Sequence, residues 1–174
     1  MKSSDLIKHL TESGLMPQEE TLELPRSEKN LFIGIPRETA LQENRVALVP
    51  DSVGLLVNNG HRVLIESKAG EPANFTDKDY SEAGAEIVSD AKDVYRANII
   101  IKVAPPTLEE VAMFDPMQKQ ILFSALQITS QPKDCMKQLM KQKVTCVAYD
   151  FIKDRDGVYP IVRSMSEIAG NTSI

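Results

Sequence analysis

Several residue types that build common functional sites are scarce in this chain. It contains two cysteines, two histidines and no tryptophan among 174 residues. Cys135 and Cys146 lack CxxC spacing, and His9 and His61 are far apart, so one chain cannot supply a four-ligand zinc site. We therefore expect no metal centre, and we expect both cysteines to be buried thiols in a reducing compartment.

Long hydrophobic segments are also absent. The opening residues, MKSSDLIKHLTESGLMPQEE, have no apolar core of the kind found in a secretory signal, and no apolar run approaches the roughly 20 residues of a membrane span. The net charge is −5 and the pI about 5.1, which argues against a nucleic-acid-binding surface, and a polybasic patch for anionic lipid is missing. The sequence predicts a cytoplasmic protein that binds neither nucleic acid nor membrane.

Motifs for phosphate binding and for nucleophilic catalysis are missing as well. The sequence holds neither GxGxxG nor GxxxxGK[ST], and the most similar turn, Lys68-Ala69-Gly70-Glu71, has one glycine. No serine or cysteine nucleophile has a neighbouring histidine, because His61 follows Gly60 at a turn. A two-component receiver needs acidic side chains after its first strand, where this chain has Pro36-Arg37-Glu38. These classes are excluded.

What the chain does have is a regular alternation of short apolar runs and amphipathic segments. With 42% hydrophobic and 26% charged residues, it has the composition of an ordinary globular protein. The pattern predicts a doubly wound, mostly parallel α/β sheet in three layers, flavodoxin-like (Rossmann-like), because apolar runs joined by helices are typical of βαβ units. Strands are expected at 31–35, 61–67, 86–89, 98–103, 120–126 and 144–152, and helices at 50–59, 76–83, 91–97, 107–114 and 131–143.

Residues 1–30 differ from this pattern. They are rich in charge, are interrupted by Pro17 and Pro25, and carry one short apolar stripe that predicts a brief helix near 4–13. We interpret residues 1–30 as an arm that packs on the main body or on a neighbouring subunit.

Basic residues follow several of the predicted strands. Arg37, Arg45, Lys68 and Lys102 all come after strand ends, and ligands of such sheets bind outside the carboxyl ends of the strands. We expect these side chains to converge on one pocket for a small anion, such as a carboxylate. Each also has a plainer interpretation as a surface ion pair or a strand-end charge.

A series of motifs points to a family. GIPRE, NRVALVP, GHRVLIESKAGE, IIIKV, ILFSAL and SMSEIAG occur in this order from residue 34 onward. In combination they resemble the amino-terminal domain of the alanine dehydrogenase and nicotinamide nucleotide transhydrogenase family, from about residue 31 to the end. The resemblance implies a substrate domain at 31–164, completed by a returning carboxyl-terminal segment, and a separate Rossmann domain that binds NAD.

The resemblance also implies that this chain is part of a longer enzyme. Residues 165–174 resemble the start of the helix that leads into the NAD domain. We therefore expect a truncated chain or a fragment, inactive alone, whose NAD is bound mainly by the domain that it lacks. The full-length protein is expected to be a homo-oligomer.

The family's site residues match only in part. Arg45, in the NRV motif, is at the position of the arginine that binds the substrate carboxylate, and Lys102 and Arg37 are further expected substrate-binding residues. Where alanine dehydrogenases usually read Lys-Val-Lys-Glu-Pro, residues 102–106 read Lys-Val-Ala-Pro-Pro, so Ala104 replaces a lysine that binds substrate. Gln127 stands at the catalytic histidine position, and glutamine cannot transfer a proton near neutral pH as imidazole can.

The resemblance favours one branch of the family. DGVYPIVRSMSEIAG (156–170) lacks the Arg-Ala-Gln-Ser loop of transhydrogenase α chains and is similar to the alanine dehydrogenase version. This implies NAD-dependent oxidative deamination of L-alanine, or a similar small amino acid, to the 2-oxo acid. Two alternatives stay open: a transhydrogenase-like hydride-transfer subunit, and a non-catalytic relative that lost the usual lysine and histidine.

Overall fold

The computed structural model describes residues 30–172 of the chain. The arm predicted for residues 1–30, with its helix near 4–13, therefore lies outside the described residues except for Asn30. Among the helices described, none is long and apolar enough to cross a membrane.

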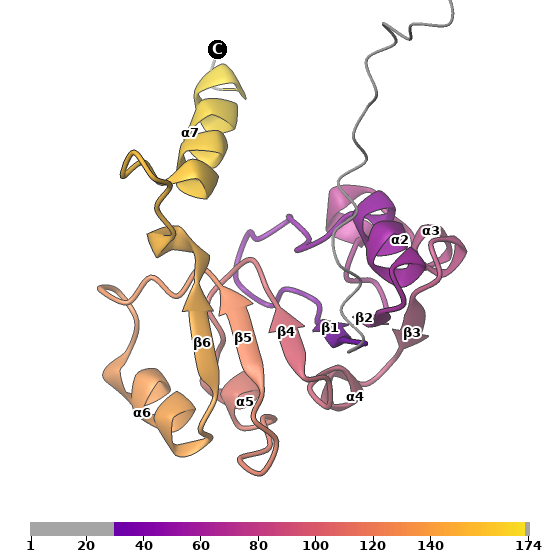
Figure 1. The fold of residues 1–174 in the computed structure, drawn as a ribbon, viewed down its shortest axis with the longest axis horizontal. Helices are drawn as coiled ribbons and strands as arrows, with labels where there is room; N and C mark the ends of the chain where they lie inside the picture. Colours follow the sequence, from indigo (N-terminus) through magenta and orange to yellow (C-terminus); the bar gives the residue numbers. More distant parts are fainter. Residues whose placement is uncertain (1–29, 173–174) are drawn as a thin grey trace, which may run out of the picture.

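A six-stranded parallel sheet forms the centre of the described region (Figure 1). Its strand order is β3-β2-β1-β4-β5-β6, and every neighbouring pair runs parallel. The doubly wound, three-layer α/β prediction is confirmed; the order of the strands is that of dinucleotide-binding Rossmann folds rather than the 2-1-3-4-5 order of flavodoxin. The strands are β1 (Phe32–Ile35), β2 (Arg62–Glu66), β3 (Glu86–Val88), β4 (Ile99–Ile101), β5 (Ile121–Ser124) and β6 (Thr145–Ala148).

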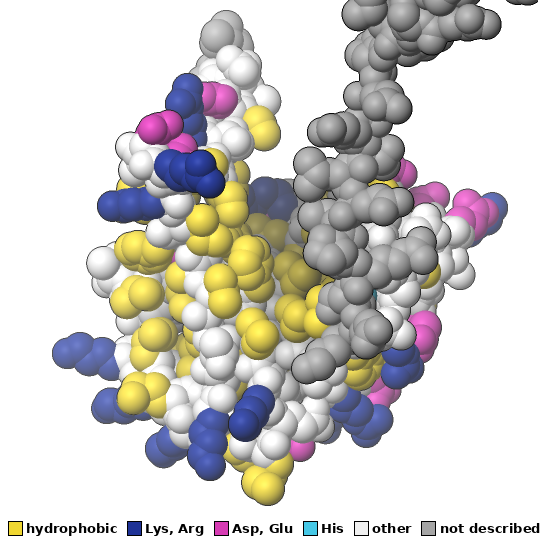
Figure 2. Space-filling view, in the orientation of Figure 1, with side chains coloured by type: hydrophobic (Ala, Val, Ile, Leu, Met, Phe, Trp, Pro, Cys, Tyr) yellow, Lys and Arg dark blue, Asp and Glu magenta, His cyan; other side chains and the backbone are white. Residues whose placement is uncertain are grey.

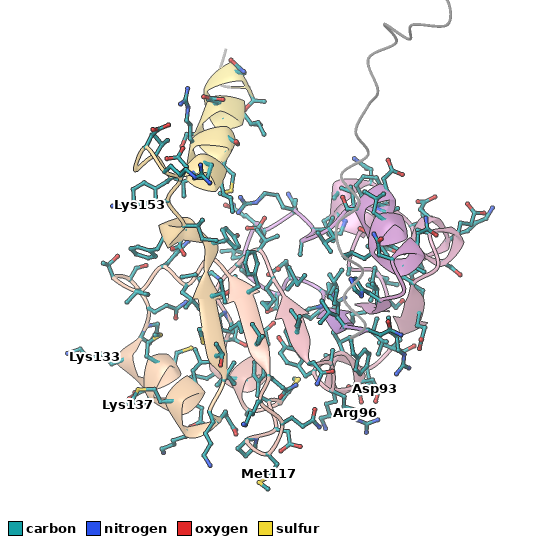
Figure 3. All side chains as sticks on the ribbon, viewed as in Figure 1. Asp93, Arg96, Met117, Lys133, Lys137 and Lys153 are labelled. Carbon is teal, nitrogen blue, oxygen red and sulfur yellow. The ribbon has the colours of Figure 1, made fainter. Side chains whose placement is uncertain are left out.

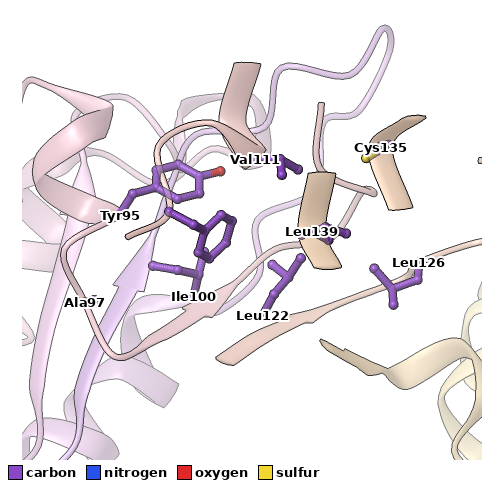
Figure 4. Packing of buried hydrophobic residues seen from close by; sticks show 9 residues of the cluster. Tyr95, Ala97, Ile100, Val111, Leu122, Leu126, Cys135 and Leu139 are labelled. Atoms are coloured by element: carbon purple, nitrogen blue, oxygen red, sulfur yellow. The ribbon is translucent and has the colours of Figure 1, made fainter. Parts of the chain in front are cut away.

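One face of the sheet is covered by α4 (Ala91–Val94), α5 (Leu108–Val111) and α6 (Lys133–Lys141), and we call it the α4–α6 face. Ile100 of β4 and Leu122 of β5 are fully buried there, together with Val111 of α5 and Leu139 of α6 (Figure 4). Tyr95 and Phe114 pack edge to face in the same cluster, with ring centroids 5.1 Å apart. This cluster is the larger hydrophobic core.

The opposite face carries α2 (Pro50–Asn58) and α3 (Asp77–Glu82), and we call it the α2–α3 face. Val53 of α2 and Tyr80 of α3 are buried against Ile35 and Ile65, so β1 and β2 are well covered. Strand side chains alternate between faces, so Ile101 and Phe123, which flank buried residues of the other face, lie on this side and are only partly buried. Figure 2 shows hydrophobic side chains gathered over this part of the sheet, below α7 (Pro160–Thr172).

Local sequence explains where the helices begin. Thr76 and Thr107 each form a capping box with the acidic residue three positions later, which satisfies backbone donors at the starts of α3 and α5. Pro50 occupies the first turn of α2, where its missing N–H is not needed. Gly34 lets β1 approach α4 closely, since a Cβ there would lie 2.5 Å from the carbonyl oxygen of Val94.

Every predicted strand and helix from residue 31 to 143 is present, although several are shorter at their ends. The predicted strand 144–152 ends at Ala148 and continues as a short 3-10 helix, η2 (Tyr149–Phe151), and another 3-10 helix, η1 (Glu71–Ala73), follows β2. The last helix, α7, begins at Pro160 rather than at Met165. Proline favours that first turn, so the helix starts five residues before the motif that suggested it.

Candidate functional site

Two cavities open at the carboxyl edge of the sheet, the end nearer α7 in Figure 1. The smaller, about 360 Å³, we call the Arg45 cavity; the larger, about 750 Å³, we call the switch-point cavity. The Arg45 cavity is lined by Arg45, Val46, Ala47, Leu48, Ile101, Lys102, Val103, Phe123, Tyr149, Ile161 and Met165. The switch-point cavity is lined by Pro36, Arg37, Thr39, Glu66, Ala91, Tyr95, Pro105, Pro106, Thr107, Leu108, Glu109, Glu110, Met113, Gln131, Pro132 and Cys135.

Arg45 is the principal charged group of the Arg45 cavity. Its Nε donates to Oε1 of Glu43 at 2.7 Å, and a second bond joins Nη2 to the other carboxylate oxygen. Nη1 contacts the sulfur of Met165 at 3.6 Å, which is a weak acceptor. The hydrogen bond from Arg45 lowers the pKa of Glu43 despite its partial burial. The guanidinium is therefore fixed on one edge and has Nη1 available for an anion in the cavity.

Lys102 points away from the Arg45 cavity. It is 1% exposed, and its Nζ lies 2.7 Å from Oε1 of Glu110 on α5 and 3.2 Å from Oε2 of Glu38. Lys102 follows buried Ile100 by two residues, so both side chains point to the α4–α6 face. The side chain of Lys102 therefore turns away from the cavity, and its backbone borders it. Its ammonium is occupied by two carboxylates of the chain itself.

Glu38 and Glu110, the two carboxylates that pair with Lys102, are residues that the sequence analysis did not single out. Glu38 also accepts the backbone N–H of Val103 at 2.6 Å and that of Ala104 at 3.3 Å, and Glu110 accepts the N–H of Thr107 at 2.7 Å. The Glu38–Lys102–Glu110 cluster thereby ties the loop after β1 to the loop after β4. The capping-box spacing Thr107-x-x-Glu110 was a signal for one of the two, since it places the glutamate at a helix start.

Arg37 and Lys68 do not join Arg45. Arg37 lines the switch-point cavity, where its backbone N–H donates to Glu66 at 2.8 Å and its Nε lies 3.9 Å from the same carboxylate. Lys68 lines neither cavity and donates its backbone N–H to Asp77. The prediction that four cations converge on one pocket is therefore wrong. The connection from residue 36 to 49 is long enough to put Arg37 and Arg45 in different cavities, and strand alternation turns Lys102 the other way.

Ala104 and Gln127, the two departures from the family pattern, line neither cavity. Ala104 is 7% exposed and its backbone N–H donates to Glu38. Gln127 is exposed, has a φ of 44°, and donates its N–H to Asp150 at 3.0 Å. The structure thus does not bring these two positions into one crevice, because the turn after β4 is drawn toward Glu38 and the turn after β5 toward Asp150.

Tyr149 is the second polar group of the Arg45 cavity. Its hydroxyl donates to the carbonyl of Val103 at 2.6 Å, and its ring lies beside Phe123 with centroids 5.7 Å apart. Burial raises the pKa of its phenol. Tyr149 is buried and also forms a wall of the cavity.

Several charged residues lie at the periphery of the molecule. Figure 3 shows Lys133 and Lys137 of α6, Met117 and the Asp93–Arg96 ion pair at the far periphery of the molecule; that pair is 2.9 Å apart. Within residues 30–172, His, Cys, Asp and Glu side chains form no cluster of three that could hold a metal ion. Cys135 is buried and Cys146 half-buried, both as free thiols.

Comparisons with known proteins agree with the motif series. Residues 34–169 match the model of the family described as "Alanine dehydrogenase/PNT, N-terminal domain". The chain is 40% identical over 141 residues to alanine dehydrogenase of Bacillus subtilis, covering 80% of this chain and 36% of that protein. It is 41% identical over 145 residues to alanine dehydrogenase of Methanococcus maripaludis, covering 83% of this chain and 38% of that protein.

Solved structures give the same result for the fold. An L-alanine dehydrogenase superposes with a TM-score of 0.77 at 38% identity, over 82% of this chain and 38% of that one. A transhydrogenase from Sinorhizobium meliloti superposes with a TM-score of 0.64 at 24% identity, over 71% of this chain and 36% of that one, and shows the fold alone. The chain spans less than two fifths of the length of these relatives. It belongs to the alanine dehydrogenase/PNT N-terminal domain family.

Proposed function

We propose that this chain is the substrate domain of an NAD-dependent alanine dehydrogenase-like oxidoreductase that acts on L-alanine or a similar small amino acid. The observation that carries the proposal is the Arg45 cavity: one guanidinium, held by Glu43, in a mostly apolar pocket of about 360 Å³. A cavity with one cation and hydrophobic walls suits a small carboxylate with a short apolar side chain.

Arg45 would bind the substrate carboxylate through Nη1, since its other edge is held by Glu43. Phe123, Tyr149 and Met165 would surround the methyl group and keep water from it. Lys102 is proposed to act indirectly. It pairs with Glu38, which fixes the backbone of Val103, and the Tyr149 hydroxyl is hydrogen-bonded to the carbonyl of Val103.

Hydride transfer would need NAD, and the described residues do not fit a dinucleotide. In Rossmann folds the pyrophosphate lies on a tight, glycine-rich turn after β1, whereas residues 36–49 contain no glycine and separate β1 from α2 by a long loop. We therefore propose that NAD binds to a separate domain. The partly bare β4–β6 part of the α2–α3 face supports a returning segment of further chain that completes the substrate domain.

The roles of Gln127 and Arg37 stay predictions. A catalytic role for Gln127 would require the turn after β5 to move toward the Arg45 cavity, and a substrate-binding role for Arg37 would require it to leave Glu66. Cytoplasmic location, predicted from the sequence, and homo-oligomerisation of the full-length protein, implied by the family resemblance, also stay proposals.

The experiment that tests the proposal is a calorimetric titration of this chain with pyruvate and L-alanine. We expect weak, saturable binding that Arg45→Met weakens about tenfold or more, since a hydrogen bond to a charged group contributes roughly 1.5–3 kcal/mol. Arg96→Met is the matched control, because Arg96 also pairs with a nearby acid in the sequence but lies in the turn after α4. Equal affinity in both variants would remove Arg45 from the site, and low-micromolar binding of NAD would contradict a separate cofactor domain.

One observation favours two other functions. These are hydride transfer without acid–base chemistry on a substrate, and a purely non-catalytic role. Among the described residues no histidine borders the Arg45 cavity, and the usual lysine and histidine positions hold Ala104 and Gln127. In a chain fused to an NAD domain we expect weak L-alanine turnover. A gain in the double variant Ala104→Lys, Gln127→His, where general acid–base assistance contributes about 10²–10⁴-fold, would require the turns after β4 and β5 to move toward the Arg45 cavity, which neither residue lines here. Strong turnover in the wild type without that gain would contradict this expectation.

A further inference from the structure

Glu38 connects the buried charge cluster to the turn that follows β4. It lies in the loop after β1, its side chain is 5% exposed, and its Oε2 is 3.2 Å from the Nζ of Lys102. Its Oε1 accepts the backbone N–H of Val103 at 2.6 Å, and its Oε2 accepts that of Ala104 at 3.3 Å. One carboxylate therefore holds two consecutive N–H groups of this turn.

The turn that Glu38 holds forms part of the wall of the Arg45 cavity. Val103 lines this cavity, and its carbonyl accepts a hydrogen bond from the hydroxyl of Tyr149 at 2.6 Å. Tyr149 lines the same cavity from η2, which follows β6. Loops after three different strands, β1, β4 and β6, are thus joined by hydrogen bonds that run from Glu38 to the cavity.

The charge of Glu38 also acts on the two polar groups of the cavity. Burial raises the pKa of the Tyr149 phenol, the charge of Arg45 lowers it, and the charge of Glu38 raises it. The hydrogen bond with Glu43 is the first cause of the raised pKa of Arg45, and the charge of Glu38 is a further one. Glu38 therefore influences Tyr149 and Arg45 although it does not line the cavity itself.

Glu110 is similar to Glu38 in burial and in charge partner but differs in its other contacts. Its Oε1 lies 2.7 Å from the same Lys102 ammonium, and its side chain is 7% exposed. It accepts further hydrogen bonds from the backbone N–H of Thr107 and from the hydroxyl of Thr39. Glu110 thus shares the cation of Glu38 but holds the start of α5 in place of the cavity wall.

We propose that Glu38 is a positioning residue of the Arg45 cavity. It holds the Val103 carbonyl where the Tyr149 hydroxyl binds it, and so fixes the wall against which a small carboxylate substrate lies. Lys102 supplies the positive charge that offsets the burial of the Glu38 carboxylate. The inference rests on the function proposed for this cavity and adds a residue that does not touch the substrate.

The first measurement follows the Tyr149 hydrogen bond and needs no ligand. The chain has four tyrosines, so ¹³Cζ-labelled tyrosine gives four NMR resonances, and Tyr149→Phe identifies the one of interest. Glu38→Gln keeps the shape of the side chain but replaces one acceptor with a donor, which opposes the second backbone N–H. We expect Glu38→Gln to shift the Tyr149 resonance and Glu110→Gln to leave it in place. An unmoved resonance in Glu38→Gln would overturn the proposal.

The second measurement is calorimetric titration with pyruvate. We expect Glu38→Gln to weaken binding about three- to tenfold, as the loss of one hydrogen bond does, and Glu110→Gln to leave it unchanged although both variants lose stability. Glu38→Asp, which keeps the charge but shortens the reach to Val103, is used if Glu38→Gln does not fold, and is expected to change both measurements in the same direction. Equal affinities of the Glu38 and Glu110 variants would overturn the proposal.

A double-mutant cycle distinguishes positioning from a general loss of structure. Tyr149→Phe removes the last hydrogen bond of the series and leaves the charge cluster intact. If Glu38 acts through Tyr149, the affinity losses of Glu38→Gln and Tyr149→Phe do not add in the double variant, and additive losses would contradict the proposal. The proposed function fails separately, if the wild type binds neither pyruvate nor L-alanine, and the Tyr149 resonance then still decides whether Glu38 holds the cavity wall.

Discussion

The two faces of the sheet are covered to very different extents. On the α4–α6 face three helices cover the sheet, and Ile100, Leu122 and Leu139 are almost fully buried. On the α2–α3 face two helices cover β1 and β2, while Ile101 and Phe123 stay partly exposed. The difference follows from the winding, because each crossover helix lies on the side to which the chain turns. The Arg45 cavity lies where cover is incomplete, so the site and the gap in the helix layer have the same cause.

The largest effect is expected at the buried charge cluster of the α4–α6 face. Lys102→Met leaves Glu38 and Glu110 buried without their shared cation, and breaking a buried ion pair on one side costs about 3–5 kcal/mol. Urea unfolding measures the change in the free energy of unfolding. Lys137→Met, which alters an exposed lysine of α6, is the control and should stay within about 0.5 kcal/mol.

Neighbouring isoleucines of β4 compare the two faces directly. Ile100 points into the α4–α6 face and is fully buried, whereas Ile101 points to the α2–α3 face and is partly buried. We expect Ile100→Ala to lower the free energy of unfolding by about 2–5 kcal/mol and Ile101→Ala by about 1 kcal/mol, since both the transfer and cavity contributions scale with burial.

If Ile100→Ala and Ile101→Ala lower the free energy of unfolding equally, the α2–α3 face is covered in solution by more than its two helices. A dependence of the Ile101→Ala effect on protein concentration would then show that a second copy of the chain covers that face.

Much of this fold could be predicted from the sequence. Apolar runs such as LFIGI, the N-cap residue Thr76 and the first-turn residue Pro50 mark the elements in the sequence, because their effects are local. The order of the strands could not be predicted, since buried parallel strands all have similar apolar sequences. For the same reason the run NIIIKV did not indicate the face to which Lys102 points.

The candidate site was less predictable than the fold. Arg45 was found through its motif, but its partners in the cavity, Tyr149 and Met165, lie more than a hundred residues away along the chain. Glu38 and Glu110 meet only after β1 and β4 become neighbours in the sheet. Contacts of this kind depend on tertiary pairing, and a single sequence carries no signal for them.

A smaller, pH-dependent effect is expected at the open rim, where Arg45 pairs with Glu43. The hydrogen bond lowers the pKa of Glu43 in the folded chain, so its stabilisation is complete above the usual glutamate range near 4.5 and is lost as the pH falls through the lowered value. Because the Arg45 side chain is 54% exposed, we expect Arg45→Met to cost less than about 1 kcal/mol at neutral pH.

Unfolding curves of the wild type and Arg45→Met between neutral and acidic pH check this expectation. The difference in the free energy of unfolding should be constant near neutrality and should shrink toward zero in acid. A difference that grows in acid would mean that Arg45 does not stabilise the ionised form of Glu43.

The smallest effect is expected at Tyr95, and a second tyrosine gives the comparison. Tyr80, on the α2–α3 face, is fully buried and donates its hydroxyl to the carbonyl of Leu48 at 2.9 Å, whereas the Tyr95 hydroxyl on the α4–α6 face lies near the Glu110 carboxylate without a hydrogen bond of good geometry among the described residues. Tyr80→Phe removes a hydrogen bond and should lower the free energy of unfolding by about 1 kcal/mol. Tyr95→Phe removes only a buried polar atom and should leave that free energy unchanged or slightly raised, since an unsatisfied group opposes folding. Urea unfolding of both variants measures the contrast. A loss at Tyr95→Phe as large as at Tyr80→Phe would mean that the Tyr95 hydroxyl is hydrogen-bonded to Glu110 in the folded chain, and would contradict the expected difference between the two tyrosines.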